Sequence, residues 1–343
     1  MTDVITVEVL ADGDTDNWDA YVRSRNDASF FHLSGWRRIL ESALGHRTYY
    51  YVAKSNKQIV GVLPLVHVKS LLFGNSLSSL AFGAYGGTIA DNTTIRDRLD
   101  EQAVTLGREL RVGTIEFRLR EPSDKGRPTK ELYERFVKPI LPDEDENMKA
   151  IRGKQRNVIR KGMKNGLEAR VDTVDVFYDI YAESVRNLGT PVFPFKLFQA
   201  MAMTFPDHTE VITVALGDKP ISSALVYYHG DEVCPYYWGG TFAARGLKGN
   251  DVLAWKIMCR AAERGCSSFD FGRSKRSTGP YQWKLNLGFE PLQLYYEYEL
   301  INDNEIPSVN PLNPKYRLFI EAWKRLPLGV SKLIGPIVSR SLG

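Results

Sequence analysis

The stretch FDFGRSKRSTGPYQWKLNLGFEP, residues 269–291, decides how this chain is interpreted. It begins as a half-buried strand should, because two phenylalanines flank the charged Asp270. From Gly272 onward, glycines and basic residues interrupt the alternation and predict a flexible cationic loop. The alternation then resumes and ends in an aromatic–lysine step at Lys284. We therefore expect a strand that carries the loop to a site, and an extended segment that returns Lys284 to it.

The whole chain has 343 residues, which is too long for most single cores, so we expect two domains. Its 43% hydrophobic and 25% charged residues are ordinary for a soluble globular protein. The three cysteines form no CxxC pair, which suits a reduced compartment. No signal peptide and no run of 18 apolar residues is present, so we expect a cytoplasmic protein.

The net charge of +4 conceals two basic segments. Residues 149–170 carry a local charge of +7 and residues 315–343 one of +5, which leaves the remainder at −8. Basic segments on an acidic body predict two places where the protein meets anions or an anionic surface.

The chain also repeats itself. Three landmarks recur in the same order with one insertion or deletion of about nine residues, which indicates a duplicated domain. Each copy predicts a helix, a hairpin, a strand ending in Gly-Gly, a helix and a strand, and hence an α/β (α+β) fold with mixed sheets flanked by helices. The matching pairs are 52–63 with 214–225, 85–88 with 238–241, and 114–118 with 268–272.

Helices of the second copy are expected at residues 173–186 and 195–203. A later helix is better marked, because Asn250 is a good N-cap and Gly265 suits the position after the C-terminus.

These features resemble the Fem family of aminoacyl transferases. The similar elements are the YYWGGT strand, a helix ending in AERG, the FDFG strand and the Y-x-x-K-x-x-x-GF segment, which together are most specific over residues 236–291. The resemblance implies two tandem GNAT-like domains, at residues 1–145 and 146–300, with the active site in the second and a basic amphipathic tail at 301–343. The stretch that begins at residue 269 looks most like the FemAB-like branch found beside exosortase and exopolysaccharide gene clusters.

Fem enzymes take amino acids from aminoacyl-tRNA and deliver them to a peptidoglycan precursor, so the resemblance implies the same chemistry here. One departure concerns the acyl-CoA loop of ordinary GNAT enzymes, because residues 245–250 place their basic and glycine residues in a different register. The co-substrate therefore remains either aminoacyl-tRNA or acyl-CoA, with no tightly bound cofactor expected.

Three residues are candidates for catalysis. Lys284 falls where the family's catalytic lysine lies, and an ammonium there would stabilise the oxyanion that forms during acyl transfer. Alternation places Tyr237 on the opposite face from its neighbours, as a candidate substrate-facing hydroxyl. Asp270 could orient a cation such as Arg273, act as a base, or form a structural salt bridge. The alternative for Lys284 is a surface lysine on a strand.

Cationic and aromatic residues are candidates for substrate binding, because arginine and lysine bind phosphate or carboxylate groups. Residues 151–166 predict a basic helix with arginines four apart, where like charges repel, so we favour a polyanionic or phosphorylated ligand over a solvated face. The candidates are Arg273, Lys275, Tyr281, Trp283, Arg156, Arg160 and Lys161.

The tail combines helical spacing of large apolar residues with basic residues, and Pro327 divides it. Such a helix suits the surface of an anionic membrane, and packing back on the first domain is the alternative.

No GxSxG, P-loop, GxGxxG, HExxH or Cys/His cluster occurs, so hydrolases, kinases and metalloenzymes lose support and no metal is expected. We expect a transferase that moves an aminoacyl or acyl group onto an amine or hydroxyl of a lipid-linked or nucleotide-linked cell-envelope precursor. One alternative is an acyl-CoA-dependent acyltransferase acting on an exopolysaccharide or its lipid-linked intermediate. The other is a catalytically silent glycolipid-binding module.

Overall fold

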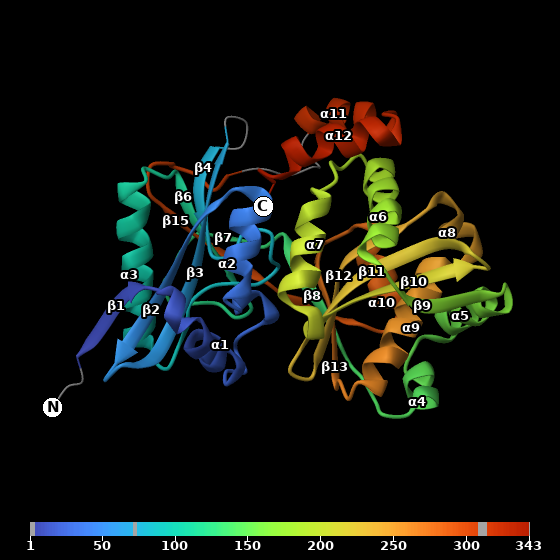
Figure 1. The fold of residues 1–343 in the computed structure, drawn as a ribbon, viewed down its shortest axis with the longest axis horizontal. Coiled ribbons are helices and arrows are strands. Elements are labelled where there is room, and N and C mark those ends of the chain that lie inside the picture. Colours follow the sequence, from blue (N-terminus) through green and yellow to red (C-terminus); the bar gives the residue numbers. More distant parts are fainter. Residues whose placement is uncertain (1–3, 71–73, 308–313, 343) are drawn as a thin grey trace. The chain divides into compact units, whose positions relative to one another are not determined.

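The computed structural model describes residues 4–70, 74–307 and 314–342 (Figure 1). The chain forms two compact units. The first comprises Met1–Tyr133, Gln293–Val309 and Arg340–Gly343, and the second comprises Glu134–Leu292 and Asn310–Ser339. The units are therefore interleaved along the chain, whereas the boundaries expected at 145 and 300 follow the repeat in the sequence.

An eight-stranded mixed sheet forms the centre of the first unit, in the order β1-β2-β3-β4-β6-β15-β7, with β5 paired to β3. β4 and β6 are parallel. Helix α3 (Thr93–Glu109) lies between β5 and β6 in the chain. Helices α1 (Thr15–Arg23) and α2 (Gly35–Ile39) precede the antiparallel hairpin that β2 and β3 form. The strands are β1 (Ile5–Val9), β2 (Arg47–Ser55), β3 (Gln58–Ser70), β4 (Gly74–Ser78), β5 (Ile89–Ala90), β6 (Thr114–Leu119), β7 (Thr129–Lys130) and β15 (Tyr295–Leu300).

A seven-stranded mixed sheet forms the centre of the second unit, in the order β14-β8-β13-β12-β11-β10-β9. β12 and β13 are parallel, as β4 and β6 are in the first unit. The strands are β8 (Tyr133–Pro139), β9 (Leu167–Asp172), β10 (Thr209–Leu216), β11 (Lys219–His229), β12 (Glu232–Gly240), β13 (Ser268–Lys275) and β14 (Glu290–Gln293). The helices are α4 (Glu144–Lys149), α5 (Gly153–Lys164), α6 (Val174–Leu188), α7 (Phe195–Thr204), α8 (Phe242–Leu247), α9 (Gly249–Glu263), α10 (Gly279–Asn286), α11 (Pro314–Lys324) and α12 (Leu328–Ser339).

The repeat read from the sequence is a repeat of structure. Each unit contains the predicted antiparallel hairpin, β2–β3 in the first and β10–β11 in the second. In the first hairpin the turn residues Asn56 and Lys57 both have positive φ, which matches the twist of the flanking strands. The predicted α/β class, with two mixed sheets flanked by helices, is confirmed.

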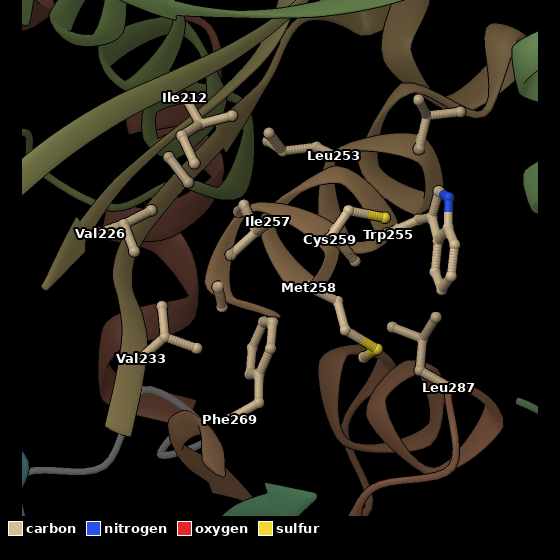
Figure 2. Packing of buried hydrophobic residues seen from close by; sticks show 14 of the residues in the cluster. Ile212, Val226, Val233, Leu253, Trp255, Ile257, Met258, Cys259, Phe269 and Leu287 are labelled. Atoms are coloured by element: carbon tan, nitrogen blue, oxygen red, sulfur yellow. The ribbon is translucent and has the colours of Figure 1, made fainter. Parts of the chain in front are cut away.

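Helix α9 forms the centre of the core of the second unit. Figure 2 shows Ile257 and Met258 of this helix packed among Val233 of β12 and Phe269 of β13. Helices α6 and α7 cover the opposite face of the sheet, where Tyr181 and Phe198 contact the ring of Tyr237. The central strands of this sheet, such as β10 and β11, are therefore buried on both faces.

The N-terminus of α9 differs from the prediction. The helix starts at Gly249, after Lys248 in the left-handed conformation, so Asn250 is not its N-cap. The side-chain oxygen of Asn250 instead accepts hydrogen bonds from Ser222 Oγ (2.5 Å) and Trp238 Nε1 (3.0 Å). The hydroxyl of Ser222 and the indole N–H of Trp238 thus bind the side-chain oxygen that would otherwise accept from the backbone of the helix. The predicted Gly265 does follow the helix, with φ of +78°.

The extended segment expected around Tyr281 and Lys284 is also wrong. These residues lie on helix α10, which begins after Thr278, whose side chain accepts from the backbone N–H of Tyr281 (3.4 Å). Pro280 in the first turn has a backbone φ suited to a helix and needs no intrahelical donor there. A local cap and a proline therefore override the alternation of aromatic residues.

The first Gly-Gly pair does not end a strand either. β4 ends at Ser78, and Gly86 lies beyond it, with its N–H donating to the carbonyl of Arg118 (2.9 Å). A Cβ atom on Gly86 would lie 1.7 Å from the carbonyl oxygen of Ser79. This glycine is required because two backbone segments meet there.

Candidate active site

The two parallel strands β12 and β13 of the second unit pair over a short distance. Their register covers Glu232↔Ser268 and Val233↔Phe269, near the beginning of both strands. Farther along, β13 turns at Gly272, which has a φ of +64° and is buried beside the ring of Tyr236. A side chain is disfavoured at this φ, so glycine is needed where β13 changes direction.

Asp270 and Lys284 hold the Gly272 turn from two sides. The Gly272 N–H donates to Asp270 Oδ1 (2.7 Å). Lys284 Nζ donates to the carbonyl oxygen of Phe271 (2.8 Å) and, at 3.4 Å, to that of Gly272. We call this arrangement the β13 turn. A carboxylate on one side and an ammonium on the other fix a backbone conformation that is rare for other residues.

Lys284 is almost completely buried, with 6% of its surface exposed. Its Nζ lies 5.2 Å from the ring centroid of Phe136 and 5.0 Å from that of Phe271. Burial lowers its pKa from 10.5 to about 8, although the Asp270 carboxylate acts in the opposite direction. The lysine therefore points inward from α10 instead of standing on the surface of a strand, and it can exchange a proton near neutral pH.

Asp270 is fully buried, and a cationic partner of its carboxylate lies on β8. Arg135 of β8 places Nη1 3.6 Å from Asp270 Oδ2. The structural salt bridge considered from the sequence is therefore present, with Arg135 as a partner. A carboxylate in this position holds the β13 turn, and the use of Asp270 as a base remains a prediction.

Tyr237 lies on the opposite face of the sheet from Trp238, as alternation predicted. Its ring packs on Phe198 and Tyr181, and its hydroxyl is buried with no hydrogen-bond partner in the described part of the chain. Burial raises its pKa well above 10, so the hydroxyl stays protonated. Its role as a substrate-facing hydroxyl remains a prediction.

The aromatic candidates of α10 surround the β13 turn. Trp283 contacts the rings of Trp238 and Phe271, and its Nε1 donates to Asp251 Oδ1 (2.8 Å). Tyr281 donates through its hydroxyl to Glu134 Oε2 (2.6 Å), and this hydrogen bond raises its pKa.

Glu134 of β8 also accepts from Arg276 Nε (2.6 Å), so it joins the basic loop to α10. Arg273 and Lys275 lie on β13 itself and are half-buried. The loop is shorter than expected because β13 continues to Lys275. Glu134 and Arg135 were not among the site residues expected from the sequence. Their only signal is that they form a charged pair within a strand of alternating residues, more than a hundred positions before Asp270.

The first turn of α9 carries a carboxylate where residues 245–250 end. Asp251 Oδ1 accepts from Trp283 Nε1 and from Gln155 Nε2 of α5 (2.6 Å). Helix N-termini attract anions, and here a side chain of the protein already supplies one. The Asp251 carboxylate thus adds a negative charge to the first turn of α9.

The basic residues of α5 have different environments. Arg156 is half-buried and donates through Nη1 to the carbonyl oxygens of Lys149 (2.7 Å) and Ile151 (3.0 Å), which satisfies the end of α4. Arg160 and Lys161 are exposed, and neither forms an ion pair within the described residues. Arg156 therefore has a structural role, while Arg160 and Lys161 present their charge to solvent.

The corresponding region of the first unit is filled by its own backbone. After β4, the Ser79 N–H donates to the carbonyl of Glu116 (2.7 Å), and buried Arg118 donates from Nη1 to the carbonyl of Gly83 (2.7 Å). The chain between these points is held against β6.

The described residues contain no group of three or more His, Cys, Asp or Glu side chains arranged to hold a metal ion. Within the same ranges, no helix is both long enough and apolar enough to cross a membrane.

Residues 148–285, which include α5 to α10, match the family model described as an acetyltransferase (GNAT) domain. A comparison with curated protein sequences gave no match. The sequence match thus covers most of the second unit.

Solved structures extend the likeness to most of the chain. A crystal structure of FemX has 14% identity and a TM-score of 0.67, and covers 92% of this chain and 100% of its own. A tandem GNAT protein from the clavulanic acid biosynthesis pathway has 13% identity and a TM-score of 0.57, with coverage of 88% and 100%. The C-terminal domain of a putative lysylphosphatidylglycerol synthetase from Agrobacterium fabrum has 14% identity and a TM-score of 0.55, with coverage of 83% and 91%. At these identities the likeness establishes the fold alone, which is that of two GNAT-like units in tandem.

Proposed function

We propose that this protein is a Fem-like transferase that moves an aminoacyl or acyl group onto an amine or hydroxyl of a cell-envelope precursor. The observation that carries the proposal is the β13 turn of a GNAT-fold unit, with a buried lysine of lowered pKa at the point where β12 and β13 part. Residues with perturbed pKa values are concentrated at functional sites.

Lys284 is the proposed catalytic residue. Attack of an amine or hydroxyl on an ester or thioester puts negative charge on the carbonyl oxygen, and an ammonium stabilises that oxyanion. The Nζ of Lys284 has three donors, of which two are directed to the carbonyls of Phe271 and Gly272, so one remains for a substrate oxygen. Asp270 and Arg135 act as positioning residues, because they hold the Gly272 turn on which this geometry depends.

Aminoacyl-tRNA is the proposed donor. The carboxylate of Asp251 at the N-terminus of α9 opposes a pyrophosphate at that position, which disfavours acyl-CoA. The exposed Arg160 and Lys161 on α5 suit a polyanion. An acyl-CoA-dependent enzyme that modifies an exopolysaccharide or its lipid-linked intermediate is the second candidate, supported by the GNAT match over residues 148–285.

The proposed acceptor is a peptidoglycan- or exopolysaccharide-related precursor, lipid-linked or nucleotide-linked. The FemX and lysylphosphatidylglycerol synthetase structures support this class only through their shared fold. An assignment to the exosortase-associated branch rests on the sequence of residues 269–291. A cytoplasmic protein that works on the inner face of the membrane, with peripheral contact through residues 315–343, is part of the proposal.

The test incubates the purified full-length protein with labelled aminoacyl-tRNA and, separately, with labelled acyl-CoA, each with and without a lipid-linked acceptor. We expect acceptor-dependent consumption of aminoacyl-tRNA. Consumption of acyl-CoA instead would select the second candidate. If neither donor is consumed but a glycolipid binds, the protein is the silent binding module.

A further inference from the structure

Helix α12 has an unusual orientation on the protein. Its small residues Ser331, Gly335 and Ser339 recur every four positions and are buried. Two of its large aliphatic residues lie away from this buried face, where Leu333 is 74% and Ile337 71% exposed. An amphipathic helix on a globular protein ordinarily turns its large apolar side chains inward. Leu333 and Ile337 depart from this rule, whereas Ile334 and Val338 of the same helix are half-buried.

The buried face of α12 is specifically fitted to the second unit. A Cβ atom on Gly335 would lie 2.9 Å from Val192 Cγ1 and 3.0 Å from its backbone nitrogen. Ser339 Oγ donates to the carbonyl oxygen of Val192 (2.9 Å), and Lys332 Nζ lies 2.5 Å from Asp179 Oδ1 on α6. These contacts set the rotation of the helix, so the outward direction of Leu333 and Ile337 is determined by the fold.

Helix α11 presents a similar outer side. Within residues 317–324 of this helix Trp323 is buried, whereas Leu318 is 81% exposed and Phe319 is 42% exposed. Figure 1 shows α11 and α12 next to each other at the end of α6. We define the outer tail surface as the exposed apolar residues of these two helices, which are Leu318, Phe319, Val330, Leu333 and Ile337.

Basic residues lie beside the outer tail surface. Arg317 on α11 and Arg325, which follows the helix, are exposed, and neither forms an ion pair within the described ranges. Glu321, on the same helix, is paired with Lys324 (2.7 Å), so its charge is compensated. Apolar side chains flanked by uncompensated cations are complementary to a surface that has an apolar interior and anionic headgroups.

We propose that the outer tail surface inserts into the headgroup region of an anionic lipid bilayer, with α11 and α12 lying flat in the interface. The packing of α12 on α6 holds this surface in place, so the second unit itself is attached to the membrane. The proposal deepens the proposed function, since a lipid-linked acceptor would be reached at that surface. Vesicle binding is measured without any donor or acceptor and is therefore independent of transfer activity.

The experiment measures sedimentation of the full-length protein with vesicles of phosphatidylglycerol and phosphatidylcholine, and with vesicles of phosphatidylcholine alone. We expect salt-sensitive binding to the anionic vesicles. The double variant Leu333→Glu, Ile337→Glu should bind them more than tenfold more weakly. Two aliphatic side chains would no longer enter the apolar part of the bilayer, and two negative charges would face its anionic headgroups. The matched control is Met203→Glu on α7, a side chain that is 80% exposed and lies outside the outer tail surface.

Binding of the control should equal that of the wild type. Because all three substituted side chains are exposed, thermal unfolding of both variants should also match the wild type. Equal vesicle binding by the double variant and the wild type would overturn the proposal. The proposal would also be overturned if the wild-type protein did not bind anionic vesicles and formed a dimer that Leu333→Glu dissociates. The partner of the outer tail surface would then be a second copy of the chain.

Discussion

Lys284 on α10 donates a 2.8 Å hydrogen bond to the backbone carbonyl of Phe271 on β13, and so joins a helix to the strand that turns at the next residue. This contact means that Lys284 has two separable effects, one on the turn and one on any oxyanion that binds near it. The variants below distinguish these effects.

Replacement of Lys284 by alanine should lower kcat for whichever donor proves active by about a hundredfold, or about 3 kcal/mol, because one fixed donor to the developing oxyanion is lost. The comparison with Lys284→Met keeps the apolar contacts of the side chain with Phe136 and Phe271. Both variants should be slow if the ammonium is needed. Recovery of full activity in Lys284→Met would restrict the lysine to a packing role.

The pH dependence of stability offers a test that requires no substrate. Burial lowers the folded-state pKa of Lys284 to about 8, below its ordinary 10.5. Between these values the unfolded chain binds more protons than the folded one, so this residue makes the free energy of unfolding rise with pH.

The measurement is chemical denaturation of the wild type and Lys284→Met at several values from pH 8 to 9.5. We expect the wild type to gain stability relative to the variant over that window. Lys138, whose pKa burial also lowers to about 8, should contribute in the same direction in both proteins and cancels in the comparison. If the free energies of unfolding of the two proteins changed in parallel with pH, folding would not lower the pKa of Lys284.

Asp270 should be structurally important. Its carboxylate is fully buried between the Gly272 N–H and Arg135, and removing one partner of a buried ion pair costs about 3–5 kcal/mol. Asp270→Ala should therefore lower the denaturation midpoint strongly. A stable but inactive Asp270→Ala would instead favour its use as a base.

The two arginines of α5 should respond differently to substitution. Arg156→Ala removes two hydrogen bonds to carbonyls at the end of α4, so we expect a loss of stability of about 2 kcal/mol in denaturant titrations. Arg160→Glu changes an exposed side chain, so stability should be unchanged while binding of aminoacyl-tRNA weakens and its salt dependence flattens. Unchanged affinity and salt dependence in Arg160→Glu would make this side of α5 a solvated face.

Gly335 provides a test of the tail packing. Gly335→Val places a branched side chain against the backbone and side chain of Val192, where even a Cβ atom is too close. We expect α12 to detach, which should appear as increased proteolysis of the tail. Gly329→Ala serves as the control, because a Cβ atom there meets nothing within 4 Å.

Local patterns were sufficient for much of the fold. The hairpins follow from alternating apolar residues and turn residues such as Asn56, and α6 begins at the predicted place because Thr173 caps it. The offset between 52–63 and 214–225 predicted a duplicated domain because each copy carries the same period and the same turns. These features depend on residues that are close together in the chain, which is why one sequence was enough.

The surroundings of the candidate site were decided by tertiary structure. Glu134 and Arg135 meet Tyr281 and Asp270 because β8 lies beside β13 in the sheet, and no pattern along the chain specifies that neighbour. The sequence determined that a lysine follows an aromatic residue at position 284. Only the fold decided that its ammonium points inward, because a helix starting after Thr278 directs the side chain toward Phe271, whereas a strand would have left it at the surface.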